Sequence, residues 1–225
     1  MSPEQQALRA EQAVAPCSPR ALMAEVQPST LNLQPSTPNP QPSTFNLQPP
    51  TPNSQRPPIT IIILTWNGLE YTRRCIESIR AHTHDIAYHL LVVDNGSSDG
   101  TLAWLRSQPE IRVIANERNL GFARGNNQGL AATPPDHDVL LLNNDTLIIQ
   151  DHWLAHLSDV AHSHPAYGIV GCTLLHPDGS LQHAGTYMPT DSFWGYQIGG
   201  GEAYIGQYPG VREVEGITGA CMYIR

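Results

Sequence analysis

The chain has 225 residues, only 14% of which are charged, and a formal net charge of −8 at pH 7. This length allows one or two domains, and the acidic balance provides no basic footprint for nucleic acid. The four cysteines are scattered and form no CxxC pair, so neither a zinc knuckle nor a disulfide framework is indicated. An anionic ligand would have to be held by a cation or by local dipoles.

The sequence shows neither a membrane span nor a secretion signal. Its longest apolar run, 59–64, is far too short to cross a bilayer. The N-terminus lacks the basic, apolar and small-residue regions of a signal peptide. We therefore expect a soluble cytoplasmic protein. Association with the inner face of the membrane is expected only through a partner or through a region outside this chain.

The first 57 residues differ in composition from the rest. All 18 glycines lie after Pro58, whereas 13 of the 20 prolines lie at or before it. Between Gln27 and Ser54 a seven-residue unit recurs as QPSTLNL, QPSTPNP, QPSTFNL and QPPTPNS. Frequent prolines remove backbone donors, and the units hold too few apolar residues to bury a face. Residues 1–57 are therefore predicted to form a disordered tail, and 58–225 the folded domain.

After the tail, short apolar runs alternate with segments of helical periodicity, which predict buried strands and helices respectively. The predicted strands are 59–64, 88–93, 111–115, 139–142 and 167–171. The predicted helices are 69–81, 101–107, 122–132 and 153–162. This alternation predicts an α/β fold with a mostly parallel sheet flanked by helices. In such sheets ligands bind beyond the carboxyl ends of the strands.

Polar segments follow each of the first four predicted strands, at the edge where a ligand would bind. They read TWNG at 65–68, DNGSSDGT at 94–101, NERNLGFARGNN at 116–127 and NNDT at 143–146. A single polar turn would carry little information. Four in succession predict a cleft lined by carboxylates and amides.

Some of these residues also have ordinary structural interpretations. Ser98 and Asp99 can cap the helix that follows them. Gly121, Gly125 and Gly129 fall four residues apart, which on a helix leaves a smooth face for close packing on the sheet. This packing is the expected role of Gly125 and Gly129.

Other polar side chains leave two interpretations open. Arg124 is either a surface arginine or a clamp for phosphate, and we count it among the nucleotide-binding candidates. Asn127 is more simply explained as an amide on a helix face. The histidines are expected to be surface or packing residues, among them His152, His162, His164, His176 and His183.

Five segments together carry a family resemblance: ITIIILTWNG, LLVVDNGSSDGT, NERNLGFARGNNQGL, VLLLNNDT and VEGITGACMYIR. In this order they resemble family 2 glycosyltransferases of the rhamnosyltransferase-like type, over about 58–225. The resemblance implies a GT-A fold, a Rossmann-like domain that binds a nucleoside diphosphate sugar and a divalent cation. It implies a UDP- or dTDP-sugar as donor, a glycan or lipid-linked acceptor, and a transfer that inverts the sugar linkage.

The resemblance also implies roles for individual residues near the nucleotide. Thr65 and Asn67 match positions beside the nucleotide. Asp94 and Asn95 match an acidic pair that contacts the base and ribose. Asn95 replaces the second carboxylate of that pair, but its amide still donates and accepts hydrogen bonds.

The segment Asn143-Asn144-Asp145 occupies the D-x-D position of the family. Only Asp145 is acidic, so it is the expected ligand of Mg²⁺ or Mn²⁺, with Asn144 contacting the nucleotide and Asn143 structural. One carboxylate is sufficient because the ion keeps several waters and binds the diphosphate oxygens. Gly219 and Ala220 match small residues beside the donor sugar.

An inverting transferase needs a general base to deprotonate the acceptor hydroxyl. In the family this base lies in an acidic motif after the segment that matches VEGITGACMYIR, and this chain ends there, at Arg225. We therefore expect the base beyond Arg225 and a truncated donor-binding half, with Glu215 the nearest acidic residue before it. Residues 195–210 are expected to form a loop over the donor sugar or a plain surface insertion.

Three functions could account for this sequence. The first is an inverting glycosyltransferase, and the second is a non-catalytic nucleotide-sugar-binding remnant of one. The third, a nicotinamide-dependent enzyme, would carry GxGxxG after the first strand, where this chain has TWNGLE.

Overall fold

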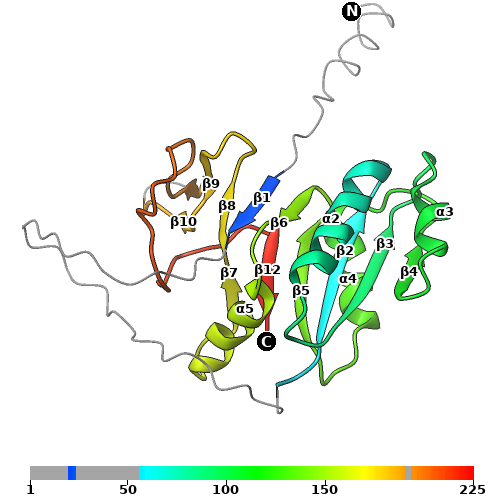
Figure 1. Cartoon of the computed structure of the whole chain (residues 1–225), viewed down its shortest axis with the longest axis horizontal. Coiled ribbons are helices and arrows are strands. Elements are labelled where there is room, and N and C mark those ends of the chain that lie inside the picture. The colour runs from blue at the N-terminus through cyan, green and yellow to red at the C-terminus, as the bar shows by residue number, and fades with distance from the viewer. Residues whose placement is uncertain (1–19, 24–55, 191–193) are drawn as a thin grey trace, which may run out of the picture.

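The structure is a computed structural model that describes residues 20–23, 56–190 and 194–225. At its centre is a six-stranded sheet with the order β4-β3-β2-β5-β12-β7 (Figure 1). The strands of this sheet are β2 (Ile59–Thr65), β3 (Tyr88–Asp94), β4 (Ile111–Ala115), β5 (Asp138–Asn143), β7 (Ile169–Gly171) and β12 (Cys221–Ile224). β2 to β5 run parallel, whereas β12 runs antiparallel between β5 and β7. The predicted α/β class with a mostly parallel sheet is confirmed.

Helices cover both faces of this sheet (Figure 1). They are α2 (Leu69–His82), α3 (Thr101–Arg106), α4 (Phe122–Ala132) and α5 (Trp153–Ser163). Apolar residues of α2, α3 and α5 pack on one face, and α4 packs on the other. No helix in the described ranges has the length and apolar character needed to span a bilayer.

Strand β2 is apolar throughout because both of its faces are covered. Ile61 and Ile63 belong to the core shared with α2 and α5, and Ile62 points into the smaller core on the opposite face. All three side chains are fully buried. Burial of each such side chain contributes about 1.5–3 kcal/mol to folding.

Helix α4 approaches β2 closely through its glycines. A Cβ atom on Gly125 would lie 2.3 Å from Cδ1 of Leu64, and one on Gly129 would lie 2.6 Å from Cγ2 of Ile62. Real Cβ atoms do not approach so closely, so a larger residue at either position would require Leu64, Ile62 or the helix itself to shift. The predicted packing role of Gly125 and Gly129 is confirmed.

Short strands build the rest of the molecule. A second sheet has the order β6-β1-β8-β9, and β10 pairs with β11. These strands are β1 (Arg20–Met23), β6 (Thr146–Ile148), β8 (Thr173–Leu175), β9 (Leu181–His183), β10 (Thr186–Tyr187) and β11 (Tyr196–Gln197). The sequence pattern predicts none of them, including β1, which lies within the predicted tail. The rest of that tail, up to Gln55, lies outside the described residues, and its disorder stays a prediction.

Candidate functional site

The carboxyl ends of the parallel strands meet at one edge of the sheet. Thr65 pairs with Asp94, and Leu64 pairs with Asn143, so the polar segments that follow these strands lie side by side. The start of β12 reaches the same edge because this strand is antiparallel. There the Asn143 backbone N–H donates to the Ala220 carbonyl at 3.0 Å. The structure therefore brings the predicted strand-end segments and the Gly219–Ala220 segment together.

Asn67 joins the loops that follow β2 and β3. Its backbone N–H donates to Ser97 Oγ at 2.7 Å, and its Oδ1 accepts the Ser98 N–H at 2.9 Å. Its φ angle is 56°, in the left-handed region that asparagine tolerates better than most residues. Asn67 thus shapes the edge at which it was predicted to contact a nucleotide.

Asp99 holds the starts of two helices. Its carboxylate accepts hydrogen bonds from the Leu69 N–H at 3.0 Å, the Thr101 N–H at 3.1 Å and Thr101 Oγ1 at 2.5 Å. Desolvation would raise the pKa of Asp99, but these hydrogen bonds outweigh it and lower the pKa below its ordinary value. The N-cap residue of α3 is Gly100, so neither Ser98 nor Asp99 occupies the predicted cap position. Asp99 instead accepts the N–H groups of the first residues of α2 and α3 from outside both helices.

Asp94 is fully buried at the end of β3. Its Oδ2 accepts the Ser97 N–H at 3.1 Å, whereas its Oδ1 has no hydrogen-bond partner among the residues that the structure describes. A buried carboxylate oxygen without a donor is unfavourable for the folded protein. This oxygen retains capacity to accept a hydrogen bond from a ligand.

Asn95 lies next to Asp94 but has a different environment. It is 2% exposed, and its side chain is hydrogen-bonded to three residues of the segment that follows β4. Sequence patterns do not predict this network, because its members are separated by more than twenty residues and no period relates them.

The D-x-D-like segment begins at the end of β5. The Asn143 carbonyl accepts a hydrogen bond from Cys75 Sγ at 3.6 Å, and burial raises the pKa of this thiol far above its ordinary value, which keeps it protonated as a donor. Asn144 Nδ2 donates to Thr65 Oγ1 at 3.2 Å and to Thr72 Oγ1 at 3.1 Å. The amide group of Asn144 thus binds the strand end to α2.

Asp145 is half-buried in the turn between β5 and β6. With Tyr71, Arg74 and Leu147 it lines a shallow hollow beside α2. Within the described ranges, no group of three or more His, Cys, Asp or Glu side chains is placed to hold a metal ion. A single carboxylate nevertheless suits Mg²⁺, which retains waters and takes one or two carboxylates together with substrate phosphates.

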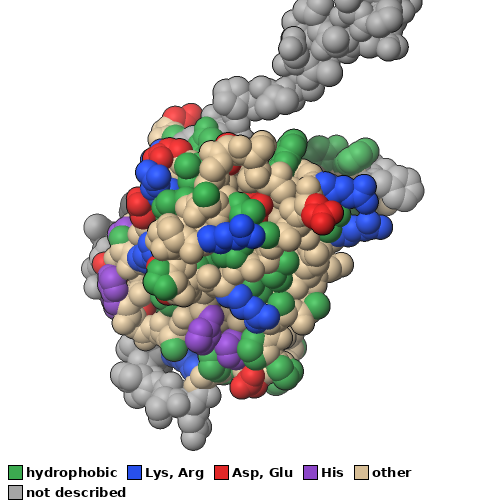
Figure 2. All heavy atoms as spheres, turned by 90° about the vertical axis from the view of Figure 1, so that its right-hand side faces the viewer, with side chains coloured by type: hydrophobic (Ala, Val, Ile, Leu, Met, Phe, Trp, Pro, Cys, Tyr) green, Lys and Arg blue, Asp and Glu red, His purple; other side chains and the backbone are tan. Residues whose placement is uncertain are grey.

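Arginine side chains lie exposed near the same edge. Arg118 and Arg124 make no hydrogen bond or ion pair with any residue in the described part of the chain. Arg124 lies in the first turn of α4, and the exposed Phe122 at the start of that helix faces Gly219, where an added Cβ would lie 3.2 Å from Phe122 Cζ. On the face shown in Figure 2, basic side chains are scattered among polar and apolar ones.

His183 supports the segment that leads into β12. It is 1% exposed, its Nε2 accepts the Thr218 N–H at 3.3 Å, and its Nδ1 is hydrogen-bonded to Gln197 Oε1. Burial lowers the pKa of His183, and the charge of Arg212 lowers it further. For this histidine the expected packing role is right, but its contact with the residue before Gly219 is not foreseen from the sequence.

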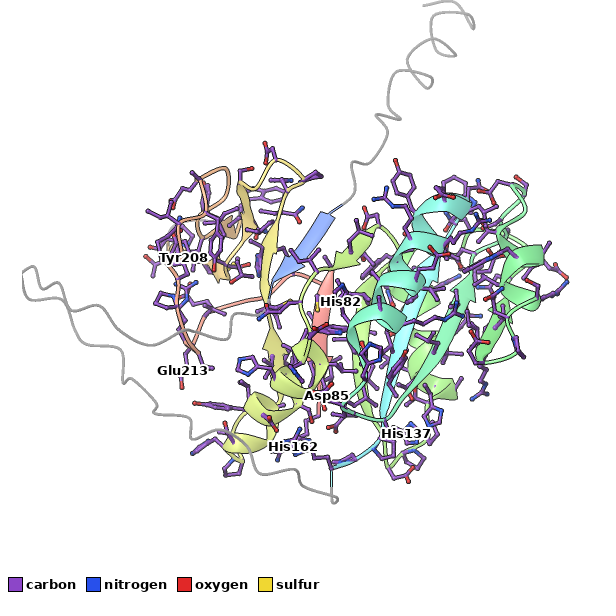
Figure 3. All side chains as sticks on the ribbon, viewed as in Figure 1. His82, Asp85, His137, His162, Tyr208 and Glu213 are labelled. Carbon is purple, nitrogen blue, oxygen red and sulfur yellow. The ribbon has the colours of Figure 1, made fainter. Side chains whose placement is uncertain are left out.

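Other histidines lie away from this edge. His137 and His162 lie where β2 and β5 begin, at the opposite edge of the sheet (Figure 3). His162 Nε2 lies 2.6 Å from Asp138 Oδ2. The exposed His152 lies on the surface and pairs with Asp85. Glu215 lies before β12, and its carboxylate accepts the backbone N–H of Met188.

Comparison with known proteins identifies the family. Residues 60–214 match the family model described as glycosyl transferase family 2. The uncharacterized protein y4gI of Sinorhizobium fredii is 32% identical over 181 residues, which are 75% of this chain and 19% of that protein. The O-antigen biosynthesis protein RfbC of Myxococcus xanthus is 29% identical over 176 residues, 75% of this chain and 14% of that protein. The chain thus spans less than a fifth of the length of either relative.

Among solved structures, a mannosyltransferase of Pyrobaculum calidifontis, PcManGT, in complex with GDP-Man and Mn²⁺, is 24% identical with a TM-score of 0.48. The match covers 55% of this chain and 37% of that one. The family model covers more than half of the chain and includes the polar segments that follow β2, β3, β4 and β5, whereas Gly219 and Ala220 lie beyond it. The chain belongs to glycosyl transferase family 2.

Proposed function

We propose that the chain binds a nucleoside diphosphate sugar with a divalent cation and transfers the sugar, with inversion, to a hydroxyl group of a glycan or lipid-linked acceptor. The observation that carries this proposal is the buried, unpartnered Oδ1 of Asp94 at the carboxyl edge of the sheet, within a family 2 domain. In parallel sheets this edge is where ligands bind.

The nucleotide is proposed to bind along the ends of β2 and β3. A carboxylate oxygen accepts hydrogen bonds, so Asp94 suits a base with a ring N–H, which uracil, thymine and guanine all have. UDP or dTDP is the carrier that we propose among these. Thr65, Asn67 and Asn144 line the adjoining edge. Asn144 is hydrogen-bonded to Thr65, and Asn67 is hydrogen-bonded to the loop that follows β3. Arg124 is free of ion pairs in the described part of the chain, and its guanidinium suits a two-point contact with a phosphate.

Asp145 is the proposed protein ligand of Mg²⁺ or Mn²⁺. When bound, the cation would offset the negative charge that develops on the departing diphosphate. Gly219 and Ala220 are proposed to let the backbone approach the sugar, because His183 and the Asn143 N–H hold this segment at the same edge.

No residue of this chain is assigned to the general base. Glu215 is a weak candidate because its carboxylate accepts a hydrogen bond from the Met188 N–H. Both residues lie in the segment 172–220 between β7 and β12, which we call the excursion. The chain therefore supplies the donor-binding part of the proposed reaction. The relatives named for O-antigen and succinoglycan biosynthesis favour a polysaccharide acceptor. The proposed location is the cytoplasm, including the inner face of the membrane.

Calorimetry on the full chain with UDP, dTDP and GDP, each with and without Mn²⁺, tests the proposal. We expect binding that depends on Mn²⁺, and we expect Asp94→Asn to weaken it more than tenfold because the amide presents a donor where an acceptor is needed. Absence of binding for every nucleotide would overturn the proposal. Binding without any sugar transfer would favour the non-catalytic alternative.

A further inference from the structure

We propose that Asn95 is a positioning residue that fixes the segment 116–121 as one wall of the nucleotide site, rather than a contact to the base. This inference rests on the proposed function, because it concerns how the same site is built. It differs from the role that the family resemblance implies for this position.

Both N–H donors of the Asn95 side chain are used in hydrogen bonds within the protein. Nδ2 donates to Asn119 Oδ1 at 3.2 Å and to the Gly121 carbonyl at 3.4 Å, and Oδ1 accepts from Asn116 Nδ2 at 2.9 Å. A side-chain amide has two N–H donors, and both are used here. No donor is left for a base, and the residue is 2% exposed.

Backbone groups fix the orientation of these amides. The Gly121 carbonyl can only accept, so the atom of Asn95 that faces it must be the nitrogen. The Gly121 N–H donates to Asn119 at 2.8 Å, so the Asn119 atom between them must be the oxygen. The assignment therefore does not depend on exchanging the nitrogen and oxygen of an amide, which is a common ambiguity.

The network continues into α4. Asn116 and Gln128 exchange two hydrogen bonds, with Nδ2 donating at 2.8 Å and Oδ1 accepting at 2.9 Å. Gly125 of the same helix lies over Asn95, where an added Cβ would be 3.3 Å from Nδ2. Asn95 is therefore hydrogen-bonded to the start, middle and end of the segment 116–121, and the first turn of α4 covers it.

The backbone of this wall also lies close to the backbone of the loop that follows β3. Gly96 has a φ angle of 80°, and a Cβ atom there would lie 2.8 Å from the Cα of Arg118. The wall that Asn95 holds therefore carries the exposed Arg118 and leads directly into the turn of α4 that bears Arg124. Through these two cations the network can affect a diphosphate without touching the base.

The same geometry explains an asparagine at this position. An aspartate at position 95 would replace two donors by an acceptor that faces two acceptors, Asn119 Oδ1 and the Gly121 carbonyl. It would also bury a charge among neutral amides, which is unfavourable. The acidic pair to which Asp94 and Asn95 correspond is therefore incompatible with the wall as this chain builds it.

The test compares Asn95→Asp with Asn127→Asp, which adds the same charge to an exposed site on α4. Dissociation constants for UDP, dTDP and GDP are measured with Mn²⁺ by calorimetry on the full chain. We expect Asn95→Asp to weaken all three by a similar factor of more than about ten, and Asn127→Asp to change none by more than about twofold. The loss of affinity in Asn95→Asp should become smaller at lower pH, compared with Asn127→Asp. Protonation of the new carboxyl group would restore one hydrogen-bond donor at position 95. Retained affinity with a changed order of preference among the nucleotides would overturn the inference.

Two further measurements keep the inference separate from folding and from the proposed function. Asn119→Ala removes an exposed member of the network, and we expect a uniform, smaller loss of about threefold for all three nucleotides. If the wild-type chain binds no nucleotide, the proposed function fails. The positioning role is then judged by amide hydrogen exchange, which should accelerate in 116–121 for Asn95→Asp and not for Asn127→Asp. Unchanged exchange in a folded Asn95→Asp protein would refute it.

Discussion

The parallel half of the sheet and the excursion between β7 and β12 are held together in different ways. Strands β2 and β3 each have seven residues, with fully buried apolar side chains on both faces. In the excursion the strands have two or three residues and depend on contacts such as the one from Thr218 to His183. The first region positions Asp94 and Asp145 by packing, and the second positions Gly219 by a few polar contacts.

The largest expected effect concerns Asp145, the proposed metal ligand at the end of the parallel strands. Asp145→Ala should weaken Mn²⁺-dependent nucleotide binding by roughly 100-fold, because loss of a metal ligand exceeds the 10–100-fold typical of residues that only support one. Calorimetry with UDP at fixed Mn²⁺ measures this. Asp151→Asn, which removes an exposed carboxylate in the next loop, serves as the control. Equal affinities for wild type and Asp145→Ala would remove Asp145 from the proposed metal site.

Overpacking the contact of α4 with β2 should produce the largest loss of stability. Gly129→Ala forces a methyl group to within 2.6 Å of Cγ2 of the fully buried Ile62 and should lower the free energy of unfolding by about 1–3 kcal/mol. Urea unfolding followed by circular dichroism measures the change. Asn127→Ala, on the exposed side of the same helix, should leave stability unchanged or slightly higher because alanine favours helices. A neutral Gly129→Ala would show that the parallel half tolerates rearrangement.

A smaller effect is expected where Asp99 links the loops after β2 and β3. Asp99→Ala removes acceptors for the Leu69 and Thr101 N–H groups and should cost about 1 kcal/mol, comparable to the loss of a helix cap. Hydrogen bonds hold the pKa of Asp99 below its ordinary value, so its contribution is present above that value and is lost as the pH falls below it. Thermal unfolding at pH 7 and pH 3 should show the difference between variants shrinking in acid.

The smallest expected effect concerns the excursion. Burial lowers the pKa of His183 in the folded chain, so the unfolded chain binds more protons as the pH falls through the ordinary value of about 6.5. The stability that depends on a neutral His183 is therefore present above that pH and is lost below it. His183→Gln should flatten this part of the stability profile between pH 7 and 5, as measured by thermal unfolding. An unchanged profile would indicate that the Thr218 contact is not coupled to protonation.

The fold could be predicted from the sequence where local patterns are strong. The expected strand 111–115 coincides with β4, and 59–64 falls one residue short of β2, because both strands are bounded by polar or turn-forming residues. The strands of the excursion have two or three residues, too few to show a period of two. The place of β12 between β5 and β7 depends on pairing between distant segments, which no local pattern records.

The same limit applies to the candidate site. The meeting of Asp94 and Asn143 at one edge follows from parallel strands with short connections, so their proximity could be predicted. The burial of Asn95 and the seating of Thr218 on His183 depend on side chains from separate elements. Sequence can show which residues reach the edge, but it does not show which of their hydrogen bonds remain for a ligand.

The pairing of β12 with β7 has a consequence for how such proteins diversify. The excursion leaves the sheet after Gly171 and returns beside it, since Met222 pairs with Gly171. A segment whose two ends are fixed next to each other can change greatly in length at small entropic cost. The region beside the predicted sugar contacts can therefore change in length while the central sheet keeps its pairing. Exchanging this segment between relatives is a direct way to test whether it sets the proposed sugar and acceptor preferences.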